Sequence, residues 1–242
     1  MEAGKIVSSS TDHNLLDDSA PVRERAGRRA LAGKLLDGYV SGPDATNKAR
    51  AEALEKVGDA RAVVVVEGIS DQIALETLAA RRGRDLDAEA VVILPIGGAH
   101  AITHHLTLLG PKGVHMQLAG LCDAGEEDIF RRGLDQVGFG SPLDRADLER
   151  LGFHVCVDDL EDELIRAAGT ARVEGLFDAH GDLGSFRTLQ TQPPWRGENV
   201  EAQMQRFLGS GARRKLRYAR ALVEAVDLDC MPHPLDAVLA DV

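Results

Sequence analysis

Four apolar runs divide the middle of the chain, and each is followed by a segment of helical composition. The runs are AVVVV (62–66), VVILPI (91–96), MQLAGLC (116–122) and FHVCV (153–157). Short, continuous runs of this kind, most of them rich in β-branched residues, are typical of strands buried on both faces. Because strands that alternate with helices favour βαβ units, the pattern predicts an α/β fold: a Rossmann-like parallel sheet of about four strands flanked by helices.

The segments on either side of this region have a different pattern. Residues 22–39 and the run that begins at Lys48 have helical composition, and SGP separates them. Towards the C-terminus, residues 188–199 predict a loop, and the helical segment that follows is interrupted at Gly209–Gly211 before a closing turn and short helix. We therefore predict three parts: an N-terminal tail and helical extension (1–60), the α/β domain (61–170) and a C-terminal helical extension (171–242).

The composition is that of a globular protein. The chain has 242 residues, of which 44% are hydrophobic, and this is enough for a sizeable core. No segment approaches the roughly 18 consecutive apolar residues that span a bilayer, and the polar N-terminus lacks an apolar signal core. Three widely separated cysteines with no CxxC spacing favour a reducing compartment, so we expect a cytoplasmic protein without membrane partners.

Negative charge is concentrated in the predicted α/β domain. The net charge of −11 argues against a protein that coats nucleic acid by bulk electrostatics. Residues 61–170 hold 10 basic and 19 acidic groups, whereas the segments before and after them are close to balance. Such a surplus either keeps the surface solvated or attracts cations.

Acidic residues follow three of the four predicted strands. Glu67 follows the first, Asp123 the third, and Asp158 and Asp159 the fourth. A single carboxylate at such a position usually caps a helix, but the carboxyl ends of parallel strands meet at one edge of the sheet. Carboxylates gathered there repel one another, and a divalent cation with oxygen ligands, such as Mg²⁺, relieves the repulsion.

Two features after the second strand have simpler explanations. Gly97–Gly98 either brings the backbone close to a phosphate or permits a tight bend from strand to helix. The second interpretation is the favoured one. His100 and His104 have a spacing that can bind zinc, but the glutamate of the zinc protease motif is missing beside His100.

The segments VVVVEGISDQIALETLA, IGGAH and LAGLCDAGEEDIF, in this order, resemble the Toprim domain shared by topoisomerases, primases and related nucleases. More narrowly, they resemble its version in the overcoming-lysogenization-defect (OLD) family of endonucleases, over about residues 61–168. The closing segment GSGARRKLRYARALVEAVDL…MPHPLDAVL resembles the helical extension at the end of those nucleases. The resemblance implies a Toprim-like fold and a metal-dependent reaction at phosphodiester bonds.

The resemblance places the metal ligands residue by residue. It matches the first-strand glutamate of the family to Glu67 and the aspartate four residues later to Asp71, and this pair is expected to bind metal. Glu67 is also the expected general base or acid. The implied cofactors are two divalent ions, Mg²⁺ or Mn²⁺.

The third-strand motif departs from the family pattern. The first aspartate of the family's D-x-D motif matches Asp123, but Gly125 stands where its second aspartate belongs. Either Glu126 or Glu127 is expected to reach the place of the missing carboxylate. The alternative is that Gly125 weakens or abolishes the metal site.

A basic cluster lies in the C-terminal extension. Lys215 is the best match to the lysine that the family has near the scissile phosphate. Its basic neighbours suit phosphate contacts with DNA, although the same residues also suit a solvated helix face. These neighbours are Arg213, Arg214, Arg217 and Arg220. Because the chain has only nine aromatic residues (1 Trp, 2 Tyr and 6 Phe), we expect backbone contacts of low sequence specificity.

The chain contains no G-x-x-x-x-G-K-[ST] motif, so no ATPase-type phosphate loop is expected. The resemblance therefore implies a Toprim protein without the ATPase module, and a separate ATPase and a second copy of the chain remain open as partners. The leading hypothesis is a metal-dependent nuclease or nucleotidyl-transfer enzyme that acts on DNA. The alternatives are a binding or regulatory module that has lost the chemistry and, less favoured, a small-molecule phosphatase or nucleotide-binding enzyme.

Overall fold

The predicted parallel sheet is present. The computed structural model describes residues 44–242, apart from the side chains of Thr46, Ala212 and Arg213. Its strands are β1 (Ala62–Val66), β2 (Val91–Pro95), β3 (Gln117–Cys122) and β4 (Phe153–Val155). All are parallel, in the order β2-β1-β3-β4. The predicted α/β class and strand number are confirmed.

The central strand β1 contacts protein on every side. It pairs with β2 and β3, and all five of its residues are buried. Val63 and Val65 belong to the hydrophobic core on one face of the sheet, and Val64 and Val66 to the core on the other. Alternate residues therefore contact opposite helix layers, which is why the run is apolar throughout rather than alternating.

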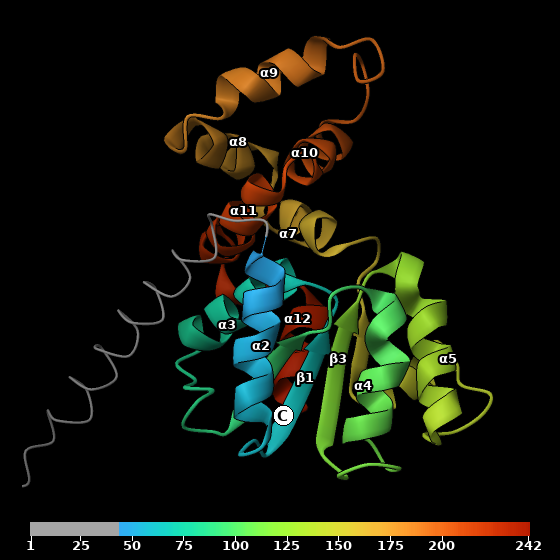
Figure 1. Ribbon diagram of the computed structural model, residues 1–242. Helices are drawn as coiled ribbons and strands as arrows, with labels where there is room; N and C mark the ends of the chain where they lie inside the picture. The colour runs from blue at the N-terminus through green and yellow to red at the C-terminus, as the bar shows by residue number, and fades with distance from the viewer. Residues whose placement is uncertain (1–43) are drawn as a thin grey trace, which may run out of the picture. The chain divides into compact units, whose positions relative to one another are not determined.

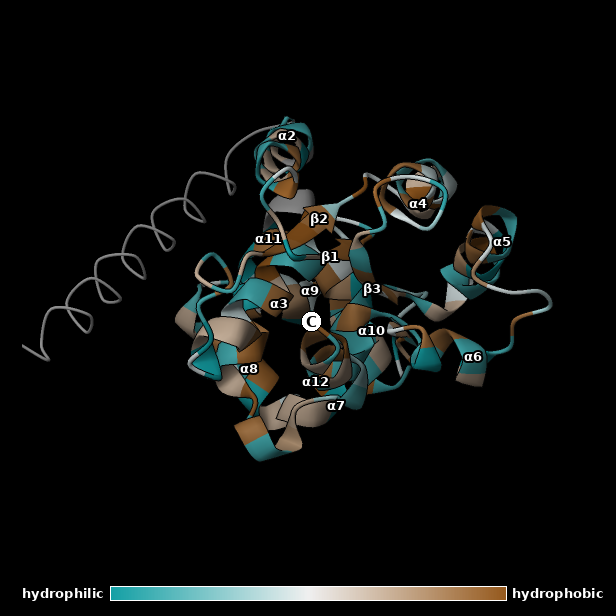
Figure 2. Ribbon diagram, turned by 90° about the horizontal axis from the view of Figure 1, so that it is seen from below, coloured by the Kyte–Doolittle hydropathy of each residue, from teal (hydrophilic) through white to brown (hydrophobic). Residues whose placement is uncertain are grey.

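Helices cover both faces of the sheet (Figures 1 and 2). One face packs against α2 (Ala45–Val57), α4 (Ile102–Leu109) and α5 (Glu127–Val137). The other packs against α3 (Ile69–Arg81) and α12 (His233–Ala240). Figure 2 shows the strands largely brown at the centre and the outward side of α2 largely teal, as expected for amphipathic covering helices. Short 3₁₀ turns precede α4, α5 and α12: η1 (Ala99–Ala101), η2 (Ala124–Glu126) and η3 (Leu228–Cys230).

The remaining helices lie on either side of β4 and in the C-terminal part of the chain. They are α6 (Arg145–Arg150), α7 (Leu160–Ala168), α8 (Thr170–Ala179), α9 (Leu183–Thr191), α10 (Val200–Gly209) and α11 (Ala212–Ala225). Phe177 forms ring contacts with Phe186, Phe207 and Tyr218, all of them buried. These side chains belong to the same core as Val64 and Val66, so the extension and the sheet share apolar packing.

Helix α11 connects the extension to the start of the sheet because it packs along α3. The Arg81 guanidinium on α3 donates to the carbonyls of Val223 and Val226, the latter at 2.6 Å. These contacts satisfy carbonyls at the C-terminal end of α11, which have no partner within the helix. The end of α11 is thereby held against the helix that follows β1.

The fourth strand and the C-terminal helices differ from the sequence-based expectations. The fourth strand ends at Val155 rather than at residue 157, because Glu163 accepts the Val157 N–H at 2.7 Å and takes it out of the ladder. Helix α9 runs to Thr191, into the predicted loop, and the sequence pattern had assigned neither α8 nor the start of α9. The helix predicted over residues 22–39 lies outside the described residues.

Among residues 44–242, no helix is both long enough and apolar enough to cross a membrane.

Gly120 leaves the space that an aromatic side chain of the neighbouring strand fills. A Cβ at this position would lie 2.5 Å from the Phe153 ring, which is itself held by Phe130 and Phe139. We expect Gly120→Ala to lower the free energy of unfolding by about 1–3 kcal/mol, since the buried ring has little room to move.

Chemical denaturation measures this change, and Gly125→Ala is the matched control. A Cβ at Gly125 meets nothing within 4 Å, so its expected effect is below about 0.5 kcal/mol. Equal losses for the two variants would contradict close packing at Gly120.

Candidate metal centre

Glu67 follows β1 directly, and the turn after β2 holds its backbone. The N–H groups of Gly97 and Gly98 both donate to the Glu67 carbonyl at 3.0 Å. These glycines have φ values of 81° and 113°, a region that other residues rarely adopt. The Gly97–Gly98 turn is therefore the bend that the sequence favoured, and it also fixes the first candidate ligand.

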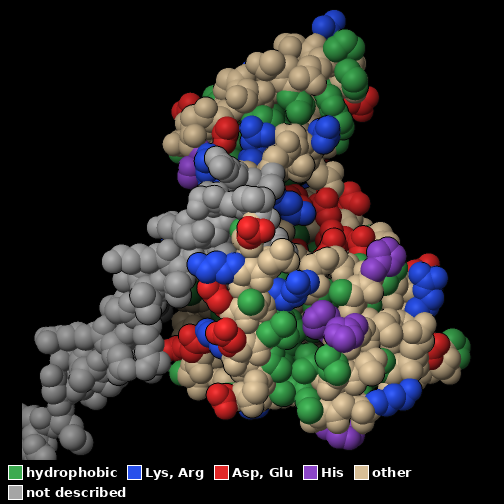
Figure 3. Space-filling view, viewed as in Figure 1, with side chains coloured by type: hydrophobic (Ala, Val, Ile, Leu, Met, Phe, Trp, Pro, Cys, Tyr) green, Lys and Arg blue, Asp and Glu red, His purple; other side chains and the backbone are tan. Residues whose placement is uncertain are grey.

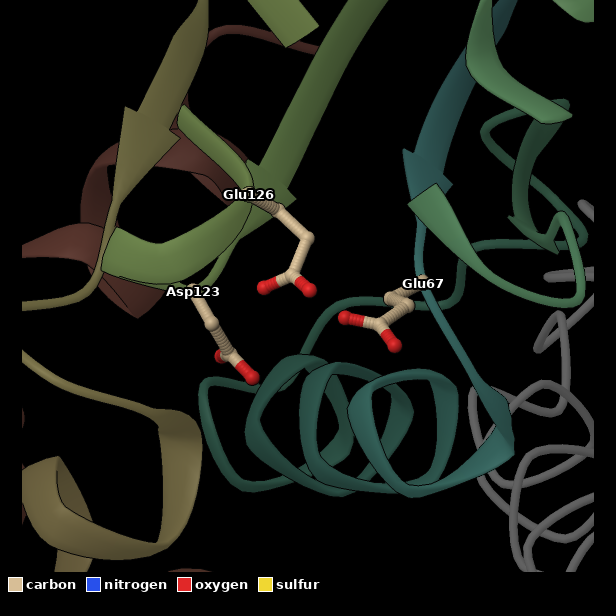
Figure 4. Close-up of side chains that lie close together, drawn as sticks. All are labelled: Glu67, Asp123 and Glu126. Carbon is tan, nitrogen blue, oxygen red and sulfur yellow. The ribbon is translucent and has the colours of Figure 1, made fainter. Parts of the chain in front are cut away.

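Asp123 and Glu126 lie at the same edge of the sheet as Glu67. Asp123 follows β3, whose Leu121 pairs with Val66 of β1, so the two strands end side by side. Glu126 ends the turn η2 that follows. Carboxylate oxygens of the three residues lie within 4.8 Å of one another, and Figure 4 shows the three side chains pointing toward one another.

Asp71, the second predicted metal ligand, lies beside this group and not within it. Its Oδ2 accepts the Gly68 N–H at 2.8 Å and so stabilises the first turn of α3. Its charge nevertheless raises the pKa of both Glu67 and Asp123. The structure thus gives Asp71 a helix-capping contact and leaves it in the electrostatic field of the candidate centre.

Of the two glutamates proposed to compensate for Gly125, the structure brings only Glu126 to the cluster. Glu127 forms an ion pair with Arg145, at the start of α6, and its Oε2 accepts from Arg145 Nε at 3.1 Å. Gly125 itself faces open space. The His100–His104 pair is not part of any metal-holding group in the described part of the chain.

Burial and mutual repulsion disfavour the charged forms of the carboxylates in this cluster. Burial is the largest cause that raises the pKa of Asp123, to about 8, and the charges of Asp71, Asp159 and Glu67 add to it. Burial is also the largest cause that raises the pKa of Glu67, and the charge of Glu126 is the second largest. Such a raised pKa means that the cations near Asp123 do not compensate its negative charge.

The donor set fits a hard divalent cation. All three groups offer carboxylate oxygens, the ligands that Mg²⁺ and Ca²⁺ prefer, and no thiolate or imidazole belongs to the cluster. A cation among them would replace the protons that burial and repulsion otherwise favour. The side chains of Glu67, Asp123 and Glu126 are thus suited to hold a divalent metal ion.

Lys215 reaches the acidic edge from α11. Its Nζ lies 3.2 Å from Glu161 Oε2, at the start of α7. Burial alone would lower the pKa of Lys215, but the charges of Glu161, Asp71 and Asp123 raise it above its ordinary value. The other oxygen, Glu161 Oε1, is buried and accepts no hydrogen bond within residues 44–242. The predicted catalytic lysine is therefore a protonated cation beside the candidate centre.

The other cations of the basic cluster are engaged within the protein. Arg217 Nη1 lies 3.3 Å from Asp182, which also accepts from the Tyr218 hydroxyl at 3.0 Å. Arg214 stacks on the Phe207 ring at 3.9 Å and lies 3.8 Å from the same aspartate. Arg220 pairs with Glu224 at 2.7 Å. Arg213, also predicted to bind nucleic acid, is outside the described side chains.

The sequence does not indicate two sets of contacts between the C-terminal helices and acidic side chains. Asp182 lies more than 30 residues from Arg217 and Tyr218, and no spacing rule connects them. Gln205 of α10 donates to Asp158 and Asp159 at 3.0 and 2.8 Å, which connects the extension to the loop after β4. From the sequence, Glu161 belongs to an acidic helix start and is a less favoured metal candidate, and nothing in the spacing indicates its contact with Lys215.

Comparisons with known proteins find a similar domain and a similar fold. A search of curated proteins finds no match to the chain. Residues 60–124 match the family model described as "Overcoming lysogenization defect protein-like, TOPRIM domain". This segment includes Glu67, Asp71 and Asp123.

Solved structures show the same fold over a longer stretch. The C-terminal region of the Xanthomonas campestris pv. campestris OLD protein matches with a TM-score of 0.60 and 22% identity, over 77% of this chain and 94% of that one. The corresponding region of the Burkholderia pseudomallei OLD protein matches with a TM-score of 0.56 and 18% identity, over 75% and 96% of the two chains. Residues 60–124 are thus similar to the OLD-like TOPRIM domain, and they lie within a fold that the chain shares with the C-terminal regions of OLD proteins.

Proposed function

We propose that this protein is a divalent-metal-dependent nuclease or nucleotidyl-transfer enzyme that acts on DNA. The observation that carries the proposal is the group of three carboxylates, Glu67, Asp123 and Glu126, inside a TOPRIM-like arrangement of strands. A TOPRIM match together with an oxygen-only metal site supports a reaction at phosphodiester bonds. The chemistry would belong to residues 61–170, and the extension 171–242 would supply Lys215.

Each side chain has a role that follows from its surroundings. Glu67, Asp123 and Glu126 would hold Mg²⁺ or Mn²⁺, and Asp71 is the neighbouring acid available to a second ion. When bound, such ions supply Lewis-acid polarisation of phosphoryl oxygens and lower the pKa of a bound water below that of bulk water.

Glu67 and Lys215 would complete the chemistry. Burial and the charge of Glu126 raise the pKa of Glu67, which suits a group that exchanges a proton as general base or acid. The Lys215 ammonium, held by Glu161, would neutralise charge that develops on the phosphate.

The second candidate is a binding or regulatory module that has lost the chemistry and works with nucleic acid or a separate ATPase. The observation that favours it is Gly125, which leaves open space where the related motif has a carboxylate. The position of Glu126 favours the enzyme, since its carboxylate supplies a third oxygen ligand close to Glu67 and Asp123. The experiments below separate the two candidates.

Cleavage of supercoiled plasmid DNA with Mg²⁺ and with Mn²⁺ tests the enzyme directly. We expect nicking or linearisation by the wild type and a loss of at least about 100-fold in Glu67→Gln, which keeps the shape of the side chain but removes its charge. Asp128→Asn is the control, because the Asp128 carboxylate pairs with Arg131 on the surface of α5. A folded wild type that cleaves with neither ion would favour the binding module.

The compensation by Glu126 can be tested through metal affinity. We expect Glu126→Gln to weaken Mn²⁺ binding, measured by calorimetry, by about tenfold or more, since one charged ligand is lost. Adding Gly125→Asp to this variant should restore part of the affinity, because the open space at Gly125 admits the new carboxylate. Unchanged affinity in Glu126→Gln would exclude Glu126 as the replacement ligand.

The raised pKa of Asp123 predicts a pH-dependent metal affinity. Below about pH 8 the cation must displace the proton that Asp123 retains, so affinity should rise with pH, by up to about tenfold per unit, and level off above this value. Calorimetry in buffers of different ionisation enthalpy would report the released proton. An affinity independent of pH between about 6 and 9 would show that metal binding does not displace a proton from Asp123.

A further inference from the structure

Helix α2 places an arginine against the turn that holds Glu67. Arg50 Nη1 lies 3.0 Å from the point where a Cβ on Gly97 would be, so the guanidinium rests on this exposed turn. Asn47 Oδ1 accepts from Arg50 Nη2 at 3.2 Å, one turn earlier on α2. No carboxylate among residues 44–242 forms an ion pair with Arg50, although the protein as a whole is acidic.

The side chains around Arg50 add no negative charge. His105 of α4 is buried, and its Nδ1 donates to the Ala101 carbonyl at 3.0 Å. Burial lowers the pKa of His105, and the charges of His104 and Arg50 lower it further. His104 is exposed and meets the His105 ring at 5.4 Å. Figure 3 shows basic and histidine side chains gathered on the surface between α2 and α4.

This surface adjoins the candidate metal centre. The turn on which Arg50 rests is the one whose two N–H groups donate to the Glu67 carbonyl. Lys215 approaches the same centre from α11, but its charge is paired with Glu161, and Arg214 and Arg217 are paired with Asp182. Arg50 is thus a cation on the turn that holds the Glu67 backbone, and no described carboxylate forms an ion pair with it.

We infer that Arg50 is a substrate-binding residue that contacts a phosphate of the nucleic-acid backbone, next to the phosphate that would lie at the Glu67–Asp123–Glu126 group. The inference rests on the proposed function and adds a contact from the segment that precedes the TOPRIM domain. A guanidinium offers a planar fork of donors that matches phosphate oxygens, and contacts of this kind position a strand without reading its sequence. The exposed Gly97–Gly98 turn leaves room for a backbone to approach it.

The test measures DNA binding rather than cleavage. Fluorescence anisotropy with a labelled DNA duplex and the corresponding single strand, in Ca²⁺ and in EDTA, gives the affinity of the folded full chain at several salt concentrations. We expect Arg50→Gln to weaken binding about tenfold at low salt and to reduce the slope of log K against log salt by about 0.9 for duplex or 0.7 for single strands, the loss of one phosphate contact. Arg50→Lys should keep the slope and lose only part of the affinity, since it keeps the charge without the fork.

Lys48→Gln is the matched control, because it removes the same charge from the same helix. The Lys48 ammonium is exposed and lies 3.7 Å from Glu52, so its loss should leave the salt slope unchanged. Wild-type binding with an unchanged slope in Arg50→Gln would overturn the Arg50 contact and leave the proposed function standing. Equal losses in Arg50→Gln and Lys48→Gln would overturn it as well, since they would indicate a general charge effect. Absence of DNA binding by the wild type would overturn both proposals.

Discussion

The parallel hydrogen-bond register between β1 and β3 determines where the acidic side chains lie. Val66 pairs with Leu121, so the two strands end together and deliver Glu67 and Asp123 to one edge. The register is stable because β1 is buried on both faces and between two neighbours, and a slip would bring a flanking charged residue, Arg61 or Glu67, into the buried sheet. Apolar burial in the sheet therefore holds like-charged carboxylates close together, and the free energy of that burial offsets their repulsion.

Much of the fold could be predicted because its signals are local in sequence. Continuous apolar runs identify β1 to β3, and the residue after each strand is readable once a parallel sheet is assumed. The sequence could not choose between Glu126 and Glu127. That choice depends on Arg145, 18 residues away, which draws Glu127 out of the cluster. The partners of Lys215 and Arg217 were equally inaccessible, because Glu161 and Asp182 reach them only through the packing of α7, α8 and α11.

The basic cluster shows that a segment rich in basic residues need not form an open positive surface in the folded protein. As a sequence, the strip around Lys215 suggests an open positive surface, but in the folded protein its described cations contact carboxylates, an aromatic face or both. Partial neutralisation keeps these cations ordered near the acidic edge while reducing their long-range field. Arg50 shows the opposite case. Its sequence context does not indicate a binding residue, and only the fold brings it to the turn after β2.

If the group formed by Glu67, Asp123 and Glu126 binds a cation, the stability of the fold depends on the concentration of that cation. A cation that binds the folded state and not the unfolded chain raises the free energy of unfolding by about 1.4 kcal/mol for each tenfold increase in concentration above its dissociation constant. The same carboxylates that would organise a reaction would therefore also make a bound ion part of what stabilises the fold. Removal of the ion would loosen first the edge where β1 and β3 end, the part of the sheet in which repulsion is otherwise unrelieved.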